Sequence, residues 1–215
     1  MVLLLDLEFC NIKSVELAFE RIGVSVTLGS SRSDIDAADI VVLPGVGSFK
    51  TAMARLNDTG LPEALRRHAL ERRRPLVGIC LGMQLLADAS TEHGRHQGLG
   101  IIPGVVRKLT SSGAGDRVPN MGWSDLAIPR ENPFIPMMFD GEAAYFAHSY
   151  HFIPEDDGDV VATITHGDGP VTAVVARDRI IGMQFHPEKS LDVGLEILKA
   201  VMDAPAMRGD VEQTP

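Results

Sequence analysis

Short apolar runs alternate with longer amphipathic segments through the first half of the chain. The runs are bounded by turn residues and are too short for helices, so they are predicted strands: Val2 to Leu5, Ser25 to Leu28, Ile40 to Leu43 and Leu76 to Ile79. The segments between and after them have helical spacing: Ser14 to Ile22, Phe49 to Leu56, Pro62 to Arg73, and a stretch that starts at Leu81. This alternation predicts an α/β fold with a mostly parallel central sheet flanked by helices.

The second half has a different pattern. Its predicted strands are separated by Gly, Pro and Asp turns, which favours additional antiparallel pairing: Gly104 to Leu109, Ala144 to Phe152, Val160 to His166, Val171 to Ala176 and Ile180 to Phe185. A last helix is predicted from Leu191 to Met202, and the residues after it are polar and rich in turn formers. We therefore expect a single domain over residues 1–203 and a frayed, flexible tail over residues 204–215.

Composition narrows the class of protein. A chain of 215 residues is long enough for one sizeable α/β domain. Its net charge of −9 argues against nucleic acid as the main partner. The two cysteines, Cys10 and Cys80, do not suggest a disulfide framework and favour a reducing compartment, so we expect a cytoplasmic protein. Asp6 ends the first apolar run after four residues, which is too short for a membrane span.

The segment Gly78-Ile79-Cys80-Leu81-Gly82 lies between a predicted strand and a predicted helix. This context is required for a nucleophile elbow, with cysteine in place of serine. The glycines relieve crowding in a sharp turn, and the start of the following helix favours a thiolate on Cys80. A buried structural cysteine in a tight turn fits the same five residues.

Two further segments could complete a site around Cys80. In Phe185-His186-Pro187-Glu188, residues two apart at the end of a strand face the same way, so His186 could exchange protons while Glu188 orients its ring. Isolated His-x-Glu spacing is also common on surfaces. In Pro44-Gly45-Val46-Gly47 the glycines would let backbone N–H groups point into a site, although such a string is also an ordinary turn.

Together the three motifs resemble the class I glutamine amidotransferases, and the resemblance extends from Leu3 to about Val201. It implies that Cys80 is the nucleophile, His186 the general base and acid, and Glu188 the residue that orients it. The backbone N–H groups of Gly47 and Leu81 would form the oxyanion hole. The resemblance also implies that L-glutamine is the substrate, and that it is positioned by Gln84 and by the segment His148-Ser149-Tyr150.

Within this family, several strings are similar to those of the glutaminase subunits of imidazole glycerol phosphate synthases. They are Pro44 to Phe49, Cys80 to Leu86, Pro119 to Trp123 and Phe185 to Ser190. This resemblance implies a heterodimer in which ammonia passes to a cyclase-type (β/α)₈ synthase subunit. Asn120, Trp123 and Lys189 would then lie at the partner interface. Trp123 could instead be ordinary core packing.

The sequence departs from the family pattern in two places. The first loop, usually Asp-x-Gly-x-Gly-Asn, is Asp6-Leu7-Glu8-Phe9-Cys10-Asn11 here, so side chains stand where glycines are free to adopt positive φ. Asn120 stands where the family usually has histidine. The segment around Asn120 faces the cyclase in the family, so this departure bears on the identity of the partner. The altered loop likewise leaves a different partner open.

Three other functions fit parts of the pattern. The first is a paralogous glutaminase that supplies ammonia to a cyclase-like synthase aminating a cell-surface sugar. The second is another cysteine hydrolase, against which the His186 to Glu188 strand end and Gln84 argue. The third is a binding module without catalysis, against which the intact Cys80, His186 and Glu188 argue. No cofactor is expected, and no metal site either, because His93 and His96 lie in a glycine-rich loop without a further ligand nearby.

Overall fold

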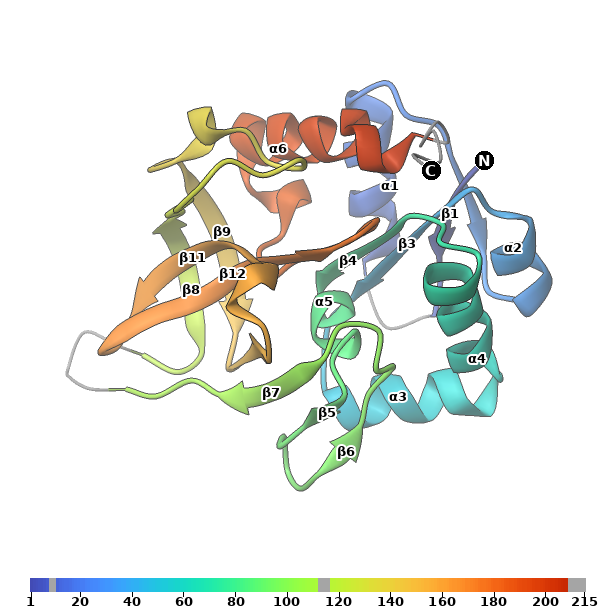
Figure 1. The fold of residues 1–215 in the computed structure, drawn as a ribbon, viewed down its shortest axis with the longest axis horizontal. Coiled ribbons are helices and arrows are strands. Elements are labelled where there is room, and N and C mark those ends of the chain that lie inside the picture. Colours follow the sequence, from blue (N-terminus) through green and yellow to red (C-terminus); the bar gives the residue numbers. More distant parts are fainter. Residues whose placement is uncertain (8–10, 112–116, 209–215) are drawn as a thin grey trace, which may run out of the picture.

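The chain folds around one large β-sheet (Figure 1). The computed structural model describes residues 1–7, 11–111 and 117–208. Within these residues the sheet has seven strands, in the order β11-β12-β13-β4-β3-β1-β2. Their bounds are β1 Val2–Leu5, β2 Val26–Gly29, β3 Ile40–Gly45, β4 Leu76–Cys80, β11 Val160–His166, β12 Gly169–Arg177 and β13 Ile180–Met183.

The pairing in this sheet confirms the predicted fold class. β2, β1, β3, β4 and β13 are joined by parallel pairs, whereas β12 pairs antiparallel with both β13 and β11. The antiparallel strands are at the C-terminal side of the sequence, as the turn-rich second half predicts. The four strands predicted in the first half all form, with ends within two residues of the predicted ones.

Helices cover both faces of the sheet. On one face the buried residues of α1 (Ile12–Arg21) and α6 (Leu191–Asp203) join one hydrophobic cluster with the sheet. On the other face the second cluster includes residues of four helices: α2 (Arg32–Ala37), α3 (Phe49–Asp58), α4 (Leu61–Arg66) and α5 (Leu81–Leu85). The sheet is therefore buried on both faces, which explains the continuous apolar runs of its parallel strands.

Two smaller sheets lie beyond the edge of the main layer (Figure 1). Their strands are β5 Ala89–Ser90, β6 His96–Gln97, β7 Gly104–Lys108, β8 Asn120–Asp125, β9 Ala143–His148 and β10 Tyr150–Pro154. The prediction of one strand from Ala144 to Phe152 was wrong, because the chain leaves the β8–β9 sheet at Ser149 and continues in the sheet of β7. Buried and more exposed side chains alternate in the same phase across the break, so periodicity does not reveal it.

The predicted helix from Pro62 to Arg73 changes type part-way. α4 ends at Arg66 and a π-helix spans Arg67–Glu71. In this wider turn both Arg67 and Arg72 reach Asp36, at 2.5 and 3.2 Å. The hydrophobic pattern does not distinguish a π-turn from an α-turn, so the sequence does not predict this change.

The expected frayed tail is packed in its first part. After α6, residues Pro205–Met207 form a 3₁₀ turn, and Met207 is buried in the same cluster as α6. The Arg179 Nε–H also donates to the carbonyl oxygen of Ala206 at 2.7 Å. Residues 209–215 lie outside the described part of the chain. Among the described residues, no helix has both the length and the apolar character needed to cross a membrane.

β4 turns directly into α5, without a loop between them. This junction brings Gly82 against the neighbouring strand, so that a Cβ built at Gly82 would be 1.7 Å from the carbonyl oxygen of Leu43. A Cβ at Gly78 would be 2.8 Å from the Gly82 oxygen. Since backbone atoms occupy both positions, neither contact could be relieved by a rotamer change.

We expect Gly82→Ala to lower the free energy of unfolding by about 3 kcal/mol, because β3 and α5 would have to separate. Urea unfolding followed by circular dichroism measures the loss. Gly169→Ala is the matched control, because a Cβ there meets no atom within 4 Å. Equal unfolding midpoints for the two variants would contradict the argument.

Candidate active site

Cys80 occupies a strained position at the junction of β4 and α5. It is the last residue of the strand and the N-cap of the helix, with φ +53° and ψ −109°. Positive φ is uncommon for a residue with a side chain and costs about 1–3 kcal/mol, so it persists only where the surroundings impose it. The strand–turn–helix context expected for Gly78 to Gly82 is therefore present, and Cys80 lines a cavity.

His186 and Glu188 form the pair expected from their spacing. His186 Nδ1 is 2.8 Å from Glu188 Oε1, and both side chains are at most 5% exposed. The geometry differs from the predicted strand end: β13 stops at Met183, and a 3₁₀ turn over Pro187–Lys189 brings the carboxylate back to the ring. With Nδ1 held by Glu188, Nε2 is the nitrogen available for proton exchange.

Ser190 fixes the backbone of His186. The Ser190 hydroxyl donates to the carbonyl oxygen of His186 at 2.7 Å and accepts the Tyr145 N–H at 2.9 Å. The His186 N–H in turn donates to the carbonyl oxygen of Tyr145 at 2.9 Å. Because Ser190 is fully buried, these bonds tie the histidine to β9 without competition from water.

The electrostatic environment favours a charged imidazole. Burial is the largest single influence on the pKa of His186 and lowers it, but the hydrogen bonds and charges of Cys80 and Glu188 together raise this pKa to about 9. His186 would thus be protonated at neutral pH, which matches the need for a proton to give to a leaving group.

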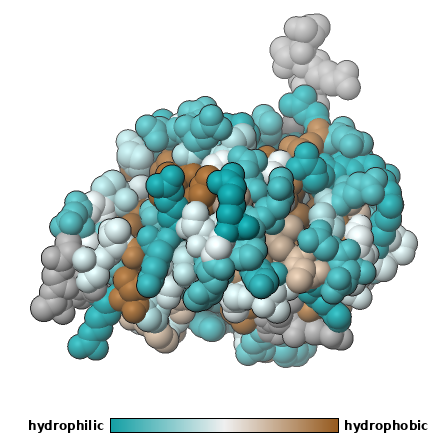
Figure 2. Space-filling model, turned by 90° about the horizontal axis from the view of Figure 1, so that it is seen from below, coloured by the Kyte–Doolittle hydropathy of each residue, from teal (hydrophilic) through white to brown (hydrophobic). Residues whose placement is uncertain are grey.

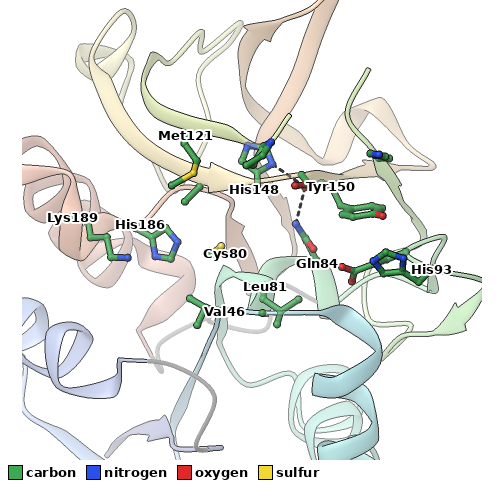
Figure 3. Close-up of a pocket in the computed structure, with 16 residues that line it drawn as sticks. Val46, Cys80, Leu81, Gln84, His93, Met121, His148, Tyr150, His186 and Lys189 are labelled. Carbon is green, nitrogen blue, oxygen red and sulfur yellow. Dashed lines mark hydrogen bonds between the residues drawn. The ribbon is translucent and has the colours of Figure 1, made fainter. Parts of the chain in front are cut away.

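A cavity of 510 Å³ opens beside Cys80 (Figure 3). It is lined by all the residues expected to bind substrate or oxyanion: Gly47, Leu81, Gln84, His148, Ser149 and Tyr150. Gly47 has φ +104°, a conformation that glycine adopts without strain. His186 and Lys189 also line this cavity, so segments from β3, β4, β9, β10 and the end of β13 meet at one place.

His148 is a neutral part of the wall rather than a charged ligand. Burial is the main reason that its pKa falls to about 4. Its Nδ1–H donates to the carbonyl oxygen of Tyr150 at 2.8 Å, and its Nε2 is 3.4 Å from Asn120 Nδ2. In this neutral form one ring nitrogen donates and the other accepts, which matches both contacts.

Of the three residues expected at a partner interface, Lys189 is the one that lines the cavity. Asn120 and Trp123 are on β8, which pairs with β9 so that Asn120 is opposite His148. Trp123 is 50% exposed and packs edge-on against Tyr145, with ring centroids 6.0 Å apart, so core packing does not account for it. Lys189 is exposed and lies at the cavity.

Sequence reasoning missed several residues of the site. Glu92 lines the cavity and accepts the Phe49 N–H at 2.5 Å, and Lys108 and Met121 line it too. Gln184 lies under Cys80, with Nε2 3.7 Å from the sulfur. The altered loop residues Glu8, Phe9 and Cys10 lie outside the described part of the chain. Among the described residues, no group of three or more His, Cys, Asp or Glu side chains could hold a metal ion.

Comparison with known proteins agrees with this geometry. Residues 3–202 match the family model for glutamine amidotransferase class-I. The chain belongs to this family. Its relatives include curated proteins named imidazole glycerol phosphate synthase subunit HisH, two of which come from Syntrophotalea carbinolica and Geobacillus kaustophilus. The one from Syntrophotalea carbinolica is 44% identical, and the match covers 93% of this chain and 98% of the relative. The one from Geobacillus kaustophilus is 43% identical, and the match covers 98% of this chain and 100% of the relative.

Solved structures of amidotransferases share the fold of this one. A structure described as a glutamine amidotransferase gives a TM-score of 0.71 at 20% identity and covers 93% of this chain and 98% of its own. PurLQS from Thermotoga maritima gives a TM-score of 0.71 at 19% identity, with 94% and 96% covered. At these identities the likeness concerns the fold alone.

We expect NMR titration of the amidotransferase, labelled with ¹³C-histidine, to place the midpoint of His186 near pH 9. Glu188→Gln should lower this midpoint, because it removes the charge that stabilises the imidazolium. His148 is an internal control in the same spectra, since its midpoint should move the opposite way, to about 4. A His186 midpoint that Glu188→Gln leaves unchanged would contradict the assignment.

The raised pKa of His186 also determines the direction in which its contribution to the unfolding free energy changes with pH. Because the folded-state pKa of His186 lies above the ordinary histidine value of 6.5, the stabilisation that its charge provides is fully present below pH 6.5 and is lost as pH rises through about 9. The difference in unfolding free energy between the wild type and His186→Asn should therefore shrink over this interval. A difference independent of pH would contradict it.

Proposed function

We propose that this chain is the glutaminase subunit of an imidazole glycerol phosphate synthase, hydrolysing L-glutamine and passing the ammonia to a cyclase subunit for histidine biosynthesis. The observation that carries the chemical part is that Cys80 and His186 line one cavity while Glu188 holds the Nδ1 side of the His186 ring. The observation that supports the pathway is that relatives more than 40% identical over nearly their whole length have that subunit's name.

In the proposed mechanism, the Cys80 sulfur attacks the side-chain carboxamide carbon of glutamine. The negative charge that develops on the amide oxygen is stabilised by the N–H groups of Gly47 and Leu81. His186 gives a proton to the nitrogen as the C–N bond breaks, so ammonia leaves and a γ-glutamyl thioester remains. His186 then removes a proton from water as its oxygen attacks the thioester carbon, and returns that proton to the Cys80 sulfur as the C–S bond breaks and glutamate is released.

The remaining residues of the cavity match the other end of glutamine. Glutamine carries an α-ammonium and an α-carboxylate, and the cavity offers Glu92 and Lys108 as groups of opposite charge. Glu92 is held by the Phe49 N–H and by its own N–H, which donates to Ser90 Oγ at 3.1 Å. Gln84 and the backbone of Ser149 and Tyr150 supply further hydrogen-bonding groups. A free amino acid thus fits this cavity better than a peptide, which lacks these charges.

The proposed partner is a (β/α)₈ cyclase that docks over the mouth of the cavity. Around this mouth the exposed side chains include Met121, 66% exposed, and Trp123 and Lys189. An apolar centre with a neighbouring cation is a usual composition for an interface. The face shown in Figure 2 is mostly hydrophilic, with hydrophobic residues in separate small patches. The proposal implies a heterodimer in the cytoplasm.

A second recipient is kept as an alternative because of the two departures from the family pattern, the loop from Glu8 to Cys10 and Asn120. Asn120 stands on β8 beside the exposed Met121 and contacts His148, at the place where the family usually has histidine. A related synthase that aminates a cell-surface sugar would use the same glutaminase chemistry with a different docking surface. Partner specificity, not the catalytic residues, separates the two.

We expect Cys80→Ala to lower glutamine hydrolysis by at least about 1,000-fold, because it removes the sulfur that attacks the carboxamide carbon in the proposed mechanism. A coupled glutamate assay measures the rate, and circular dichroism checks the fold. Cys10→Ala is the matched control, since it removes the other thiol of the chain and should keep activity. Normal turnover by Cys80→Ala would remove the proposed mechanism.

We expect the cyclase subunit from the same source, with its nucleotide acceptor bound, to raise the glutaminase rate by at least about tenfold. Uncoupled hydrolysis would waste glutamine and release ammonia to water. The assay compares the chain alone, with the cyclase, and with the cyclase and acceptor. If no complex forms and the rate is unchanged while a glutamine analogue still labels Cys80, the sugar-aminating alternative is favoured.

A further inference from the structure

Gln184 is a fully buried polar residue next to the nucleophile. It follows β13, which pairs in parallel with β4 so that Met183 is opposite Ile79. The residues that follow Met183 and Ile79, which are Gln184 and Cys80, are therefore also neighbours. The backbone of Gln184 is held by its N–H, which donates to the carbonyl oxygen of Ala173 at 2.8 Å.

The side chain of Gln184 connects two residues of the site. Its Nε2 lies 3.7 Å from Cys80 Sγ, within reach of a hydrogen bond to sulfur. Its Oε1 accepts a hydrogen bond from Gln84 Nε2 at 2.9 Å. Gln84 Nε2 also donates to the carbonyl oxygen of Tyr150 at 2.8 Å, a bond drawn in Figure 3. Because both partners of Gln84 Nε2 are acceptors, the orientation of each amide is determined.

A purely structural role does not account for an amide at this position. Burying an amide is unfavourable unless its polar atoms are paired, and the strand around it is otherwise apolar. The Gln184 side chain bonds to Gln84 and Cys80, which both belong to the proposed glutaminase site. The bonds also run in one direction, from Gln84 to Gln184 to sulfur, so each strengthens the next.

We propose that Gln184 is a positioning residue that holds the Cys80 sulfur and couples it to the substrate-contacting Gln84. This inference rests on the proposed function. An N–H donor stabilises a thiolate and restricts the side-chain rotamer of Cys80, so that the sulfur is held ready for the amide carbon. The reactivity of Cys80 should therefore depend on Gln84, through the hydrogen bond between Gln84 and Gln184.

Three substitutions test the inference. Gln184→Met keeps the length of the side chain and removes both hydrogen bonds. Gln184→Glu keeps the shape and an acceptor for Gln84, but it replaces the donor to sulfur with an acidic group. Gln84→Met leaves Gln184 in place and removes its donor. Gln97→Met, at an exposed glutamine on β6 outside the cavity, is the matched control.

The first readout is the pH profile of Cys80 alkylation by iodoacetamide, followed by mass spectrometry of the Cys80 peptide without glutamine or partner. Gln184→Met should move the midpoint of this profile to higher pH, and Gln184→Glu should move it further, because a carboxylate repels a thiolate. Gln84→Met should also move it, but add nothing in a Gln184→Met background, because the effect passes through Gln184.

The second readout is steady-state glutaminase kinetics. Gln184→Met should lower kcat by about tenfold, the loss expected for one hydrogen bond, with a smaller change in KM. An unchanged alkylation profile and kcat in a folded Gln184 variant, with the wild type active, would overturn the inference. If the wild type does not hydrolyse glutamine but its alkylation profile still depends on Gln184, the proposed function fails and the positioning role stands. Should Gln184→Met not fold, the isosteric Gln184→Glu supplies both readouts.

Discussion

The close approach of Gly82 to the carbonyl oxygen of Leu43 allows α5 to start where β4 ends. A side chain at this point would push the helix away from β3, and the turn would need extra residues. Without them, the strain is concentrated in one residue, Cys80, whose backbone has φ +53°. The same geometry places the sulfur at the C-terminal edge of the parallel strands, where the segments that follow β3 and β13 also arrive. Under the proposed function, this junction places the nucleophile next to the segments that supply the oxyanion donors and the base.

A buried histidine next to a thiol would ordinarily remain neutral, because burial disfavours its charged form. Here that effect is outweighed by Glu188, which is itself held in a 3₁₀ turn, and by Cys80. Ser190 secures the turn by bonding to both His186 and Tyr145. The ion pair is therefore supported by backbone bonds that persist when the proton moves. This arrangement lets His186 change charge during a reaction without losing its position.

The parts of the fold and site predicted from sequence are those encoded locally. Apolar runs specify the buried parallel strands, and the glycines around Cys80 specify the turn. By contrast, the alternation of buried and exposed residues continues unchanged across the break at Ser149. In the π-turn after Arg66, Arg67 pairs with Asp36, which is distant in sequence. Gln184 and Glu92 were missed for the same reason. Their relevance comes from segments far apart in the chain, and their residue types do not by themselves indicate a site.

The break at Ser149 also brings residues expected to bind substrate next to residues expected at the partner interface. Because the chain changes sheets there, β9 is free to pair with β8, and the register puts Asn120 opposite His148. His148 is neutral. One ring nitrogen donates to the Tyr150 carbonyl oxygen and the other lies next to Asn120, so His148 connects β8 to the wall of the cavity. Tyr150 in turn accepts from Gln84, which is bonded to Gln184 beneath the sulfur. Contiguous polar contacts thus connect Asn120 to the Cys80 sulfur, and under the proposed function a partner that contacts β8 would act at the outer end of that chain.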